Sequence, residues 1–261
     1  MSDVIPETLT VEVADRVAVV TLSRPAVHNA LNDRLVAEFR EVLTGLEDDD
    51  AVGAVVLTGA GSRAFAAGAD IAEVSRYTVH TALHSSMQRA FDAVEDFPKP
   101  TIAAVNGLAL GGGCERAMAC DIRIASTAAR FGLPETALGV LPGAGGTQRL
   151  ARLVGTGRAV ELILTGRWVD AVEAREIGLV TSVVPPEELA GAARATAEQI
   201  LARGPLAVRL AKLVVRAGMD ADQRTGQVIE RLAQALLYTT ADKQEGTAAF
   251  LEKRPAAFRG D

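Results

Sequence analysis

Asn106-Gly107-Leu108-Ala109-Leu110-Gly111-Gly112-Gly113-Cys114-Glu115 is the stretch that decides the fold. The apolar run at residues 101–105 before it is typical of a buried strand, and the residues after it, as far as Cys120, are compatible with a helix. Glycines at a strand-to-helix turn let other groups approach the backbone and leave the first helical N–H groups unpaired. Such N–H groups, at the positive end of a helix dipole, suit a developing negative charge.

Other interpretations of these glycines are weaker or remain open. A dinucleotide-binding motif needs a third glycine, but Arg116 stands there after Gly111-x-Gly113, and Gln148 stands there after Gly143-x-Gly145. A phosphate loop of the Gly-Lys-Ser/Thr type is missing from the sequence. The glycines alone are equally compatible with close helix packing and no chemistry.

Two carboxylates favour chemistry. Glu115 lies in the first turn of the predicted helix, and Glu135 directly follows Pro134 in an apolar segment, residues 131–135. Apolar surroundings desolvate a carboxylate and raise its pKa toward working pH, and two acids in unlike environments can divide the roles of acid and base. A second glycine turn, residues 64–70, offers another backbone N–H, and two convergent N–H groups make an oxyanion hole.

The rest of the chain predicts an α/β body followed by helices. Residues 11–21 alternate around Ala14-Asp15-Arg16 as a β-hairpin does, and a helical period begins after Asn32. A buried strand follows at residues 54–57, and one helix is predicted to carry Leu83, Met87, Ala90, Phe91 and Val94. Strands that alternate with helices imply crossover connections. We therefore predict an α/β core over residues 1–186 and an all-helical part over residues 187–261.

Composition excludes several classes of function. The 261 residues are 49% hydrophobic, and the net charge of 27 − 33 = −6 comes without a Lys/Arg cluster, which argues against nucleic-acid binding. The sequence holds no uninterrupted apolar run of roughly 18 residues, as a membrane span requires. The acidic start, residues 1–10, does not resemble a signal peptide, and two cysteines make no disulfide framework. We expect a cytoplasmic protein. His80 and His84 have a metal-ligand spacing but no third ligand nearby, and we interpret them as a surface pair.

Together these motifs resemble the crotonase (enoyl-CoA hydratase/isomerase) superfamily. The similarity covers nearly the whole chain. The matching stretches are Arg24-Pro25 with Asn29-Ala30-Leu31, then residues 64–70, 102–115, 120–122, 131–135, 141–150, 164–166, 174–180 and 252–255.

The resemblance implies a spiral of ββα turns with a C-terminal helical part that builds a trimer, two of which commonly stack into a hexamer. It places the N–H groups of Ala69 and Gly112 around the oxygen of a CoA thioester. Glu115 and Glu135 are expected to hold a water over the C2–C3 double bond. Glu115 then helps to activate the water for attack at C3, and Glu135 protonates C2.

The resemblance also implies which residues line the substrate and that neither a cofactor nor a metal is needed, since coenzyme A is part of the substrate. The expected substrate contacts are Ala67, Gly68, Asp70, Ile71, Gly111 and Gly143. Two positions depart from the family pattern, because Ala26 and Ala72 stand where relatives often have basic residues. Contacts to the CoA phosphates must therefore come from elsewhere or be weaker. A third departure is Leu133, where many hydratases carry glutamine.

The function expected from this resemblance is a 2-enoyl-CoA hydratase. A Δ3,Δ2-enoyl-CoA isomerase shares the oxyanion hole but needs only one acid/base, so the presence of Glu115 favours the hydratase. A non-catalytic acyl-CoA-binding subunit is the alternative from another class, and retention of both acids argues against it. The expected partners are an acyl-CoA thioester and further copies of the chain, as a homotrimer or homohexamer, with neither nucleic acid nor a membrane.

Overall fold

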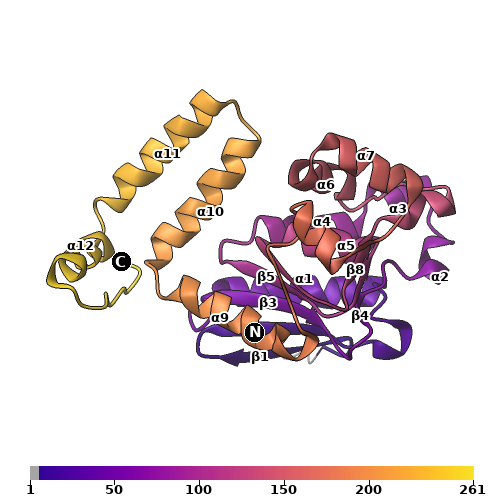
Figure 1. Cartoon of the computed structure of the whole chain (residues 1–261), viewed down its shortest axis with the longest axis horizontal. Helices are drawn as coiled ribbons and strands as arrows, with labels where there is room; N and C mark the ends of the chain where they lie inside the picture. Colours follow the sequence, from indigo (N-terminus) through magenta and orange to yellow (C-terminus); the bar gives the residue numbers. More distant parts are fainter. Residues whose placement is uncertain (1–5) are drawn as a thin grey trace.

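The chain, seen here as a computed structural model that describes residues 6–261, is built on two sheets (Figure 1). Residues 1–5, part of the stretch that argues against a signal peptide, lie outside the described residues. The larger sheet has the strand order β1 (Leu9–Ala14), β2 (Val17–Leu22), β3 (Ala54–Gly59), β5 (Thr101–Val105), β7 (Ile122–Ser126) and β10 (Ser182–Val184). The smaller sheet has the order β4 (Ala64–Ala66), β6 (Leu108–Leu110), β8 (Arg130–Gly132) and β9 (Val169–Asp170).

The chain winds between these sheets as a spiral. Strands β3, β5 and β7 of the larger sheet are each followed by a strand of the smaller sheet, namely β4, β6 and β8, and then by helices. After β4 come α2 (Ile71–Val74), α3 (Val79–Leu83) and α4 (Ser86–Glu95). After β6 comes α5 (Gly112–Ala119), and after β8 come the 3₁₀ helix η2 (Pro134–Leu138), α6 (Gly146–Val154) and α7 (Thr156–Thr165). The spiral of ββα turns is thus confirmed.

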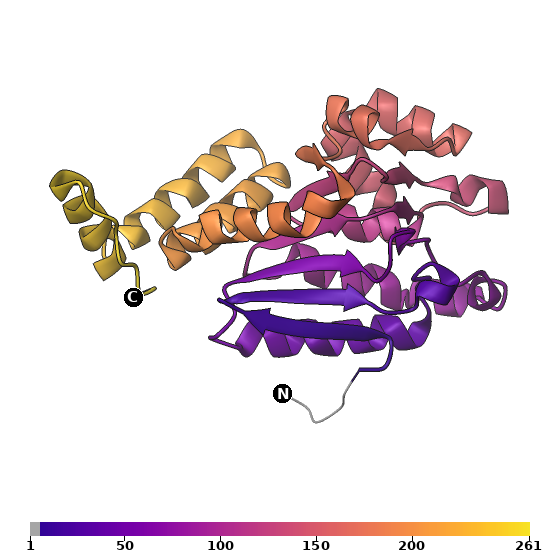
Figure 2. The ribbon, with the colours of Figure 1, turned by 60° about the horizontal axis from the view of Figure 1, so that its bottom comes forward.

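Alternation along the strands sends side chains to opposite faces of the larger sheet. On β3, Val55 and Leu57 join the core under α1 (Asp33–Asp48), whereas Ala54 and Val56 pack with α9 (Leu189–Leu201). Figure 2 shows the sheet between these two helices. The predicted hairpin is confirmed, with β1 and β2 antiparallel, and α1 begins after Asn32, whose side chain accepts a hydrogen bond from the Leu35 N–H at 3.0 Å.

One predicted helix is two helices. Leu83 ends α3, whereas Met87 and the apolar residues after it belong to α4. The prediction was wrong because Ser85 is an N-cap: its hydroxyl accepts a hydrogen bond from the Gln88 N–H at 3.2 Å and starts a new helix. This break places the start of α4 beside the glycine turn that precedes α5.

Beyond α8 (Ala171–Glu176), β10 and the 3₁₀ helix η3 (Pro186–Glu188), the chain is helical, as predicted. Helices α10 (Pro205–Met219), α11 (Gln223–Leu237) and α12 (Ala241–Glu252) form an arm that extends from the body (Figure 1). Ion pairs from α10 hold the arm: Lys212 Nζ lies 2.8 Å from Asp121 Oδ2, and Arg216 lies 2.7 Å from Asp121 and 2.8 Å from Glu95. No helix within residues 6–261 has the length and apolar character to cross a bilayer.

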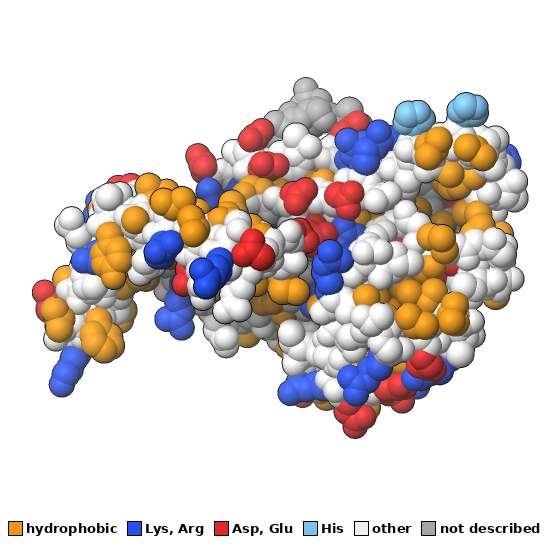
Figure 3. Space-filling model, turned by 90° about the horizontal axis from the view of Figure 1, so that it is seen from above, with side chains coloured by type: hydrophobic (Ala, Val, Ile, Leu, Met, Phe, Trp, Pro, Cys, Tyr) orange, Lys and Arg blue, Asp and Glu red, His pale blue; other side chains and the backbone are white. Residues whose placement is uncertain are grey.

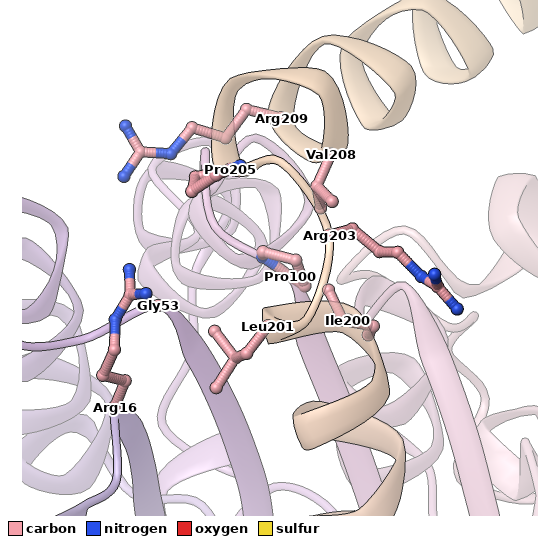
Figure 4. A pocket seen from close by; sticks show the side chains of 9 residues that line it. All are labelled: Arg16, Gly53, Pro100, Ile200, Leu201, Arg203, Pro205, Val208 and Arg209. Atoms are coloured by element: carbon pink, nitrogen blue, oxygen red, sulfur yellow. The ribbon is translucent and has the colours of Figure 1, made fainter. Parts of the chain in front are cut away.

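Where α9 turns into α10, the arm is seated closely on the body. Figure 4 shows Leu201 and Pro205 of this turn near Pro100, with Arg16 and Arg209 at the edge. The cavity between them is only about 20 Å³, so the turn is well packed. The arm is therefore packed closely against the body at this turn, although α11 and α12 contact little of the body.

Gly113 lets α5 pack directly against β4, and replacing Gly113 tests how much this contact stabilises the fold. A Cβ at Gly113 would overlap the carbonyl oxygen of Ala66 on β4. We expect Gly113→Ala to lower the free energy of unfolding by about 1–3 kcal/mol, because overpacking forces the backbone to shift. Gly191→Ala is the matched control, since Gly191 lies in α9 with nothing within 4 Å of the added methyl. Thermal unfolding should show Gly113→Ala destabilised and Gly191→Ala unchanged or more stable.

Candidate active site

A cavity of about 820 Å³ lies between the glycine turns, α1, the α3–α4 segment and η2. Both predicted acids and both predicted amides line this cavity. So do most of the predicted substrate contacts: Ala67, Gly68, Ile71, Gly111 and Gly143. Asp70 is not among the lining residues. Its carboxylate instead caps α2 by accepting a hydrogen bond from the Ala72 N–H at 3.1 Å, and it lies 3.6 Å from Arg24.

The amides of Ala69 and Gly112 are close together and free. Ala69 pairs with Leu31 in a parallel bridge, in which Leu31 bonds to Gly68 and Asp70 at 2.8 and 2.9 Å, so the Ala69 N–H points away from Leu31. Gly112 is the first residue of α5, and a Cβ built on it would lie 3.8 Å from Ala69 N. Within residues 6–261 neither N–H donates a hydrogen bond. Two free donors therefore face one cavity.

The sequence left open whether the glycines at 111–113 allow close packing or access to the backbone. In the structure, different glycines of this turn serve each role. Gly113 packs against Ala66 and has no room for a side chain. Gly111 has a φ of 50°, which favours glycine, and a Cβ there would lie 3.0 Å from Glu135 Oε1. At Gly112 the added Cβ would lie 2.8 Å from Met87 Sδ. Gly113 is thus a packing residue, whereas Gly111 and Gly112 keep the cavity open.

Glu115 is held in a fixed orientation inside the protein. Its side chain is 2% exposed, and its Oε1 accepts hydrogen bonds from the N–H groups of Ala144 and Gly146, both at 2.8 Å. Burial raises the pKa of Glu115, while the two N–H donors and the charge of Arg149 oppose that rise. One carboxylate oxygen is occupied by the backbone, and the other is available to a ligand in the cavity.

Arg149 holds the loop that orients Glu115. Its Nη1 donates to the Ala144 carbonyl at 2.8 Å, and its Nε and Nη2 donate to Glu95 and Asp92, each at 2.7 Å. Arg149 is 7% exposed, and its bonds to carboxylates are charge-assisted, which makes them stronger than neutral hydrogen bonds. Arg149 and the amides of Ala144 and Gly146 were not predicted from the sequence, although all three lie in the family-like stretch 141–150.

Glu135 differs from Glu115 in its hydrogen bonding. As predicted from its apolar neighbours in sequence, its carboxyl is desolvated. Its Oε2 is buried and has no hydrogen-bond partner among residues 6–261. Burial, with a smaller contribution from the charge of Glu115, raises the pKa of Glu135 to about 7. Leu133, buried two residues earlier, offers no polar group to this carboxyl. A carboxyl with this pKa exchanges protons readily at neutral pH, and it shares the cavity with an acid that is fixed by two amides.

Neither cysteine adds chemistry to the site. Cys114 lies next to Glu115 but is 2% exposed, and burial raises the pKa of its thiol to about 12. It packs in the core, as the sequence indicated. His80 and His84 are exposed on and after α3, and residues 6–261 hold no group of three or more His, Cys, Asp or Glu placed for one metal ion.

Comparison with known proteins agrees with this geometry. The family model for enoyl-CoA hydratase/isomerase matches residues 12–261. The chain is 46% identical to the crotonyl-CoA hydratase of Syntrophomonas wolfei, over 97% of this chain and 98% of that protein. It is 47% identical to the short-chain-enoyl-CoA hydratase of Clostridium acetobutylicum, over 92% of each. The crystal structure of an enoyl-CoA hydratase from Bacillus anthracis superposes with a TM-score of 0.94 at 44% identity, covering 98% of this chain and 100% of that one. The chain therefore belongs to the enoyl-CoA hydratase/isomerase family.

Proposed function

We propose that this chain is a 2-enoyl-CoA hydratase, which adds water across the C2–C3 double bond of the thioester and gives a 3-hydroxyacyl-CoA. Relatives named as hydratases match it over nearly their whole length. The observation that carries the proposal is the pair of acids in one cavity, beside the free N–H groups of Ala69 and Gly112: Glu115 is fixed by two amides, and Glu135 has one buried oxygen without a hydrogen-bond partner among residues 6–261.

Each group has one step in the reaction. The thioester oxygen accepts hydrogen bonds from Ala69 and Gly112, which stabilise the negative charge that develops on it. Glu115 takes a proton from the water as its oxygen attacks C3, and Glu135 gives its proton to C2. The hydroxyl on C3 and the hydrogen on C2 together account for the added water, and the proton gained by Glu115 returns to Glu135 through solvent.

The fixed geometry of Glu115 favours hydration over the alternatives. A Δ3,Δ2-enoyl-CoA isomerase moves one proton between two carbons and needs one acid/base, for which Glu135 suffices. In an isomerase, Glu115 would be a buried carboxylate held by two backbone donors that takes no part in the reaction. An acyl-CoA-binding subunit would need neither acid. In this proposal the reaction uses no cofactor beyond the coenzyme A of the substrate, and the enzyme works in the cytoplasm.

The proposal is tested by mixing the protein with crotonyl-CoA and following the ultraviolet absorbance of the enoyl thioester. We expect the absorbance to fall and 3-hydroxybutyryl-CoA to accumulate. A panel of enoyl-CoA thioesters of different length and branching, ranked by kcat/KM, then identifies the preferred acyl chain. Binding without loss of absorbance for every member of the panel would contradict the proposal.

The activity should depend on pH through both acids. Glu135 must be protonated to act, so kcat/KM should fall as the pH rises through about 7, the pKa of Glu135. Glu115 must be ionised, so kcat/KM should also fall at low pH. A bell-shaped profile is therefore expected. Glu135→Gln should remove the alkaline limb, and an unchanged alkaline limb in that variant would assign it to another group.

The C-terminal arm is the proposed site of assembly into three or six chains, with six preferred. Large apolar side chains are exposed along it, among them Leu232 at 67% and Phe250 at 83%, and Figure 3 shows hydrophobic side chains gathered along the arm. Light scattering should give the mass of three or six chains at micromolar concentration. Leu232→Lys should lower that mass, whereas Val13→Lys, at an exposed position of β1, should not. A monomeric wild type would contradict this assignment.

A further inference from the structure

Arg116 is a buried cation without a counter-charge. It lies on α5, its side chain is fully buried, and it forms no salt bridge among residues 6–261. Its Nη2 donates to the Thr58 carbonyl at 3.3 Å, while its Nε and Nη1 have no partner among those residues. A charge buried in this way is costly unless the surroundings compensate it.

Other buried arginines of the chain are satisfied. Arg123 is 5% exposed, and its Nε and Nη1 donate to the carbonyls of Leu179 and Cys120 at 2.8 and 2.6 Å. Arg116 has aromatic rings instead: its guanidinium carbon lies 4.1 Å from the ring centre of Phe65 and 5.7 Å from that of Phe39. Stacking on ring faces attracts a cation but does not neutralise its charge, so the field of Arg116 reaches beyond its contacts.

Arg116 lies on the helix that supplies one of the free amides and contacts the strand that leads to the other. Arg116 is four residues after Gly112 on the same helix, so both lie on one face of α5, about 5–6 Å apart at their Cβ positions. The Cα–Cβ bond of a helical residue tilts toward the N-terminus of the helix, so that of Arg116 tilts toward Gly112. Phe65, its nearer ring, lies on β4, four residues before Ala69. The cation thus packs behind both elements that supply the N–H donors.

The charge of Arg116 is present at working pH. Burial lowers the pKa of its guanidinium to about 10, which leaves it protonated near pH 7. The group that opposes this shift is the thiol of Cys120, and burial raises the pKa of that thiol to about 11, so it is neutral near pH 7 as well. A unit charge that no nearby anion screens acts over a longer range in the interior than in water.

We propose that Arg116 supports the oxyanion hole from behind, as a positioning residue whose positive charge adds to the stabilisation that the Ala69 and Gly112 N–H groups give the thioester oxygen. Arg116 does not touch the substrate. It raises the effect of the two donors and keeps β4 against α5. This role rests on the proposed hydratase function, because it requires negative charge to develop on an oxygen between those amides.

The test compares Arg116→Met, which removes the charge but keeps an unbranched side chain, with Arg116→Lys, which keeps the charge. We expect Arg116→Met to lower kcat at least about 10-fold with little change in KM, the effect of one charge about two helical turns away at an effective dielectric constant of about 20. Its thermal stability should be equal to or above that of the wild type, because an apolar replacement avoids burying a charge. Activity and stability should therefore move in opposite directions.

A spectroscopic readout isolates the oxyanion hole. Bound cinnamoyl-CoA should show a red-shifted absorbance in the inactive Glu115→Gln/Glu135→Gln background, where no water is added. Adding Arg116→Met should reduce that shift, and adding Arg116→Lys should retain most of it. Arg123→Met is the matched control: it loses two buried hydrogen bonds and should be less stable, but it should leave the shift unchanged.

The outcomes separate this inference from the function on which it rests. A full shift and full kcat in Arg116→Met would overturn the role of Arg116 alone. So would equal losses in Arg116→Met and Arg116→Lys with both proteins folded, because the charge would then not be responsible. If the Glu115→Gln/Glu135→Gln background without any Arg116 change bound cinnamoyl-CoA without a shift, the oxyanion hole and the proposed function would fail together.

Discussion

Glu135→Gln is expected to slow hydration of the best enoyl-CoA at least about 100-fold, and Glu115→Gln to do the same, which is the usual contribution of a positioned acid or base. Glutamine has nearly the shape of glutamate but neither gives nor takes the proton. At residue 115 its amide oxygen still accepts the N–H bonds of Ala144 and Gly146, so the loop should keep its place. The measurement is kcat by steady-state loss of enoyl absorbance.

Glu41→Gln is the control, since Glu41 is exposed on α1 and outside the cavity. It should leave kcat within about twofold, as surface substitutions usually change little. Near-wild-type kcat in either active-site variant would remove that acid from the mechanism. Loss of hydration in Glu135→Gln alone, with the Glu115 variant fully active, would favour an isomerase-like use of a single acid/base.

Ala69→Pro is expected to lower kcat about 100-fold or more, because it deletes one of the two N–H donors at the thioester oxygen. The Ala69 N–H makes no hydrogen bond within residues 6–261, so the substitution breaks no bond of the fold. The same change should reduce the red shift of cinnamoyl-CoA bound to the Glu115→Gln/Glu135→Gln protein. Circular dichroism establishes that the variant is folded.

Ala69→Gly is the matched control for this position, since it changes the side chain and keeps the N–H. It should retain most of the spectral shift. A full shift in the folded proline variant would show that the amide of Ala69 does not reach the carbonyl. The glycine turn of residues 64–70 would then be a packing device, as Gly113 is.

Periodicity and turn chemistry predicted most of the fold of the body. The alternation on β2 and the change to a helical period at Asn32 are local signals, and both elements form where these signals place them. The break at Ser85 was missed because the apolar period continues through it from Leu83 to Met87, and only the capping bond reveals two helices. The spiral itself came from the family resemblance, because strand partners from different turns are set by contacts distant in sequence.

In the candidate site, too, features set by neighbouring residues could be predicted from the sequence, whereas contacts between distant residues could not. The positions of Glu115 in a first helical turn and of Glu135 in an apolar segment could be predicted from neighbours in sequence, and the structure brings both into one cavity. The donors that fix Glu115 could not, because they are backbone groups 29 and 31 residues away. The burial and the role of Arg116 could not be predicted from the sequence, because a single arginine in a helix is most often exposed.

The most direct test of the two-acid mechanism is the fate of labelled water. Crotonyl-CoA incubated with the protein in ¹⁸O-labelled heavy water should give 3-hydroxybutyryl-CoA with ¹⁸O on C3 and one deuterium on C2, by mass spectrometry and NMR. Glu115→Gln and Glu135→Gln should each slow the appearance of both labels together, because attack at C3 and protonation at C2 belong to one addition. Deuterium entering C2 at the wild-type rate in Glu115→Gln, with no ¹⁸O on C3, would contradict the account.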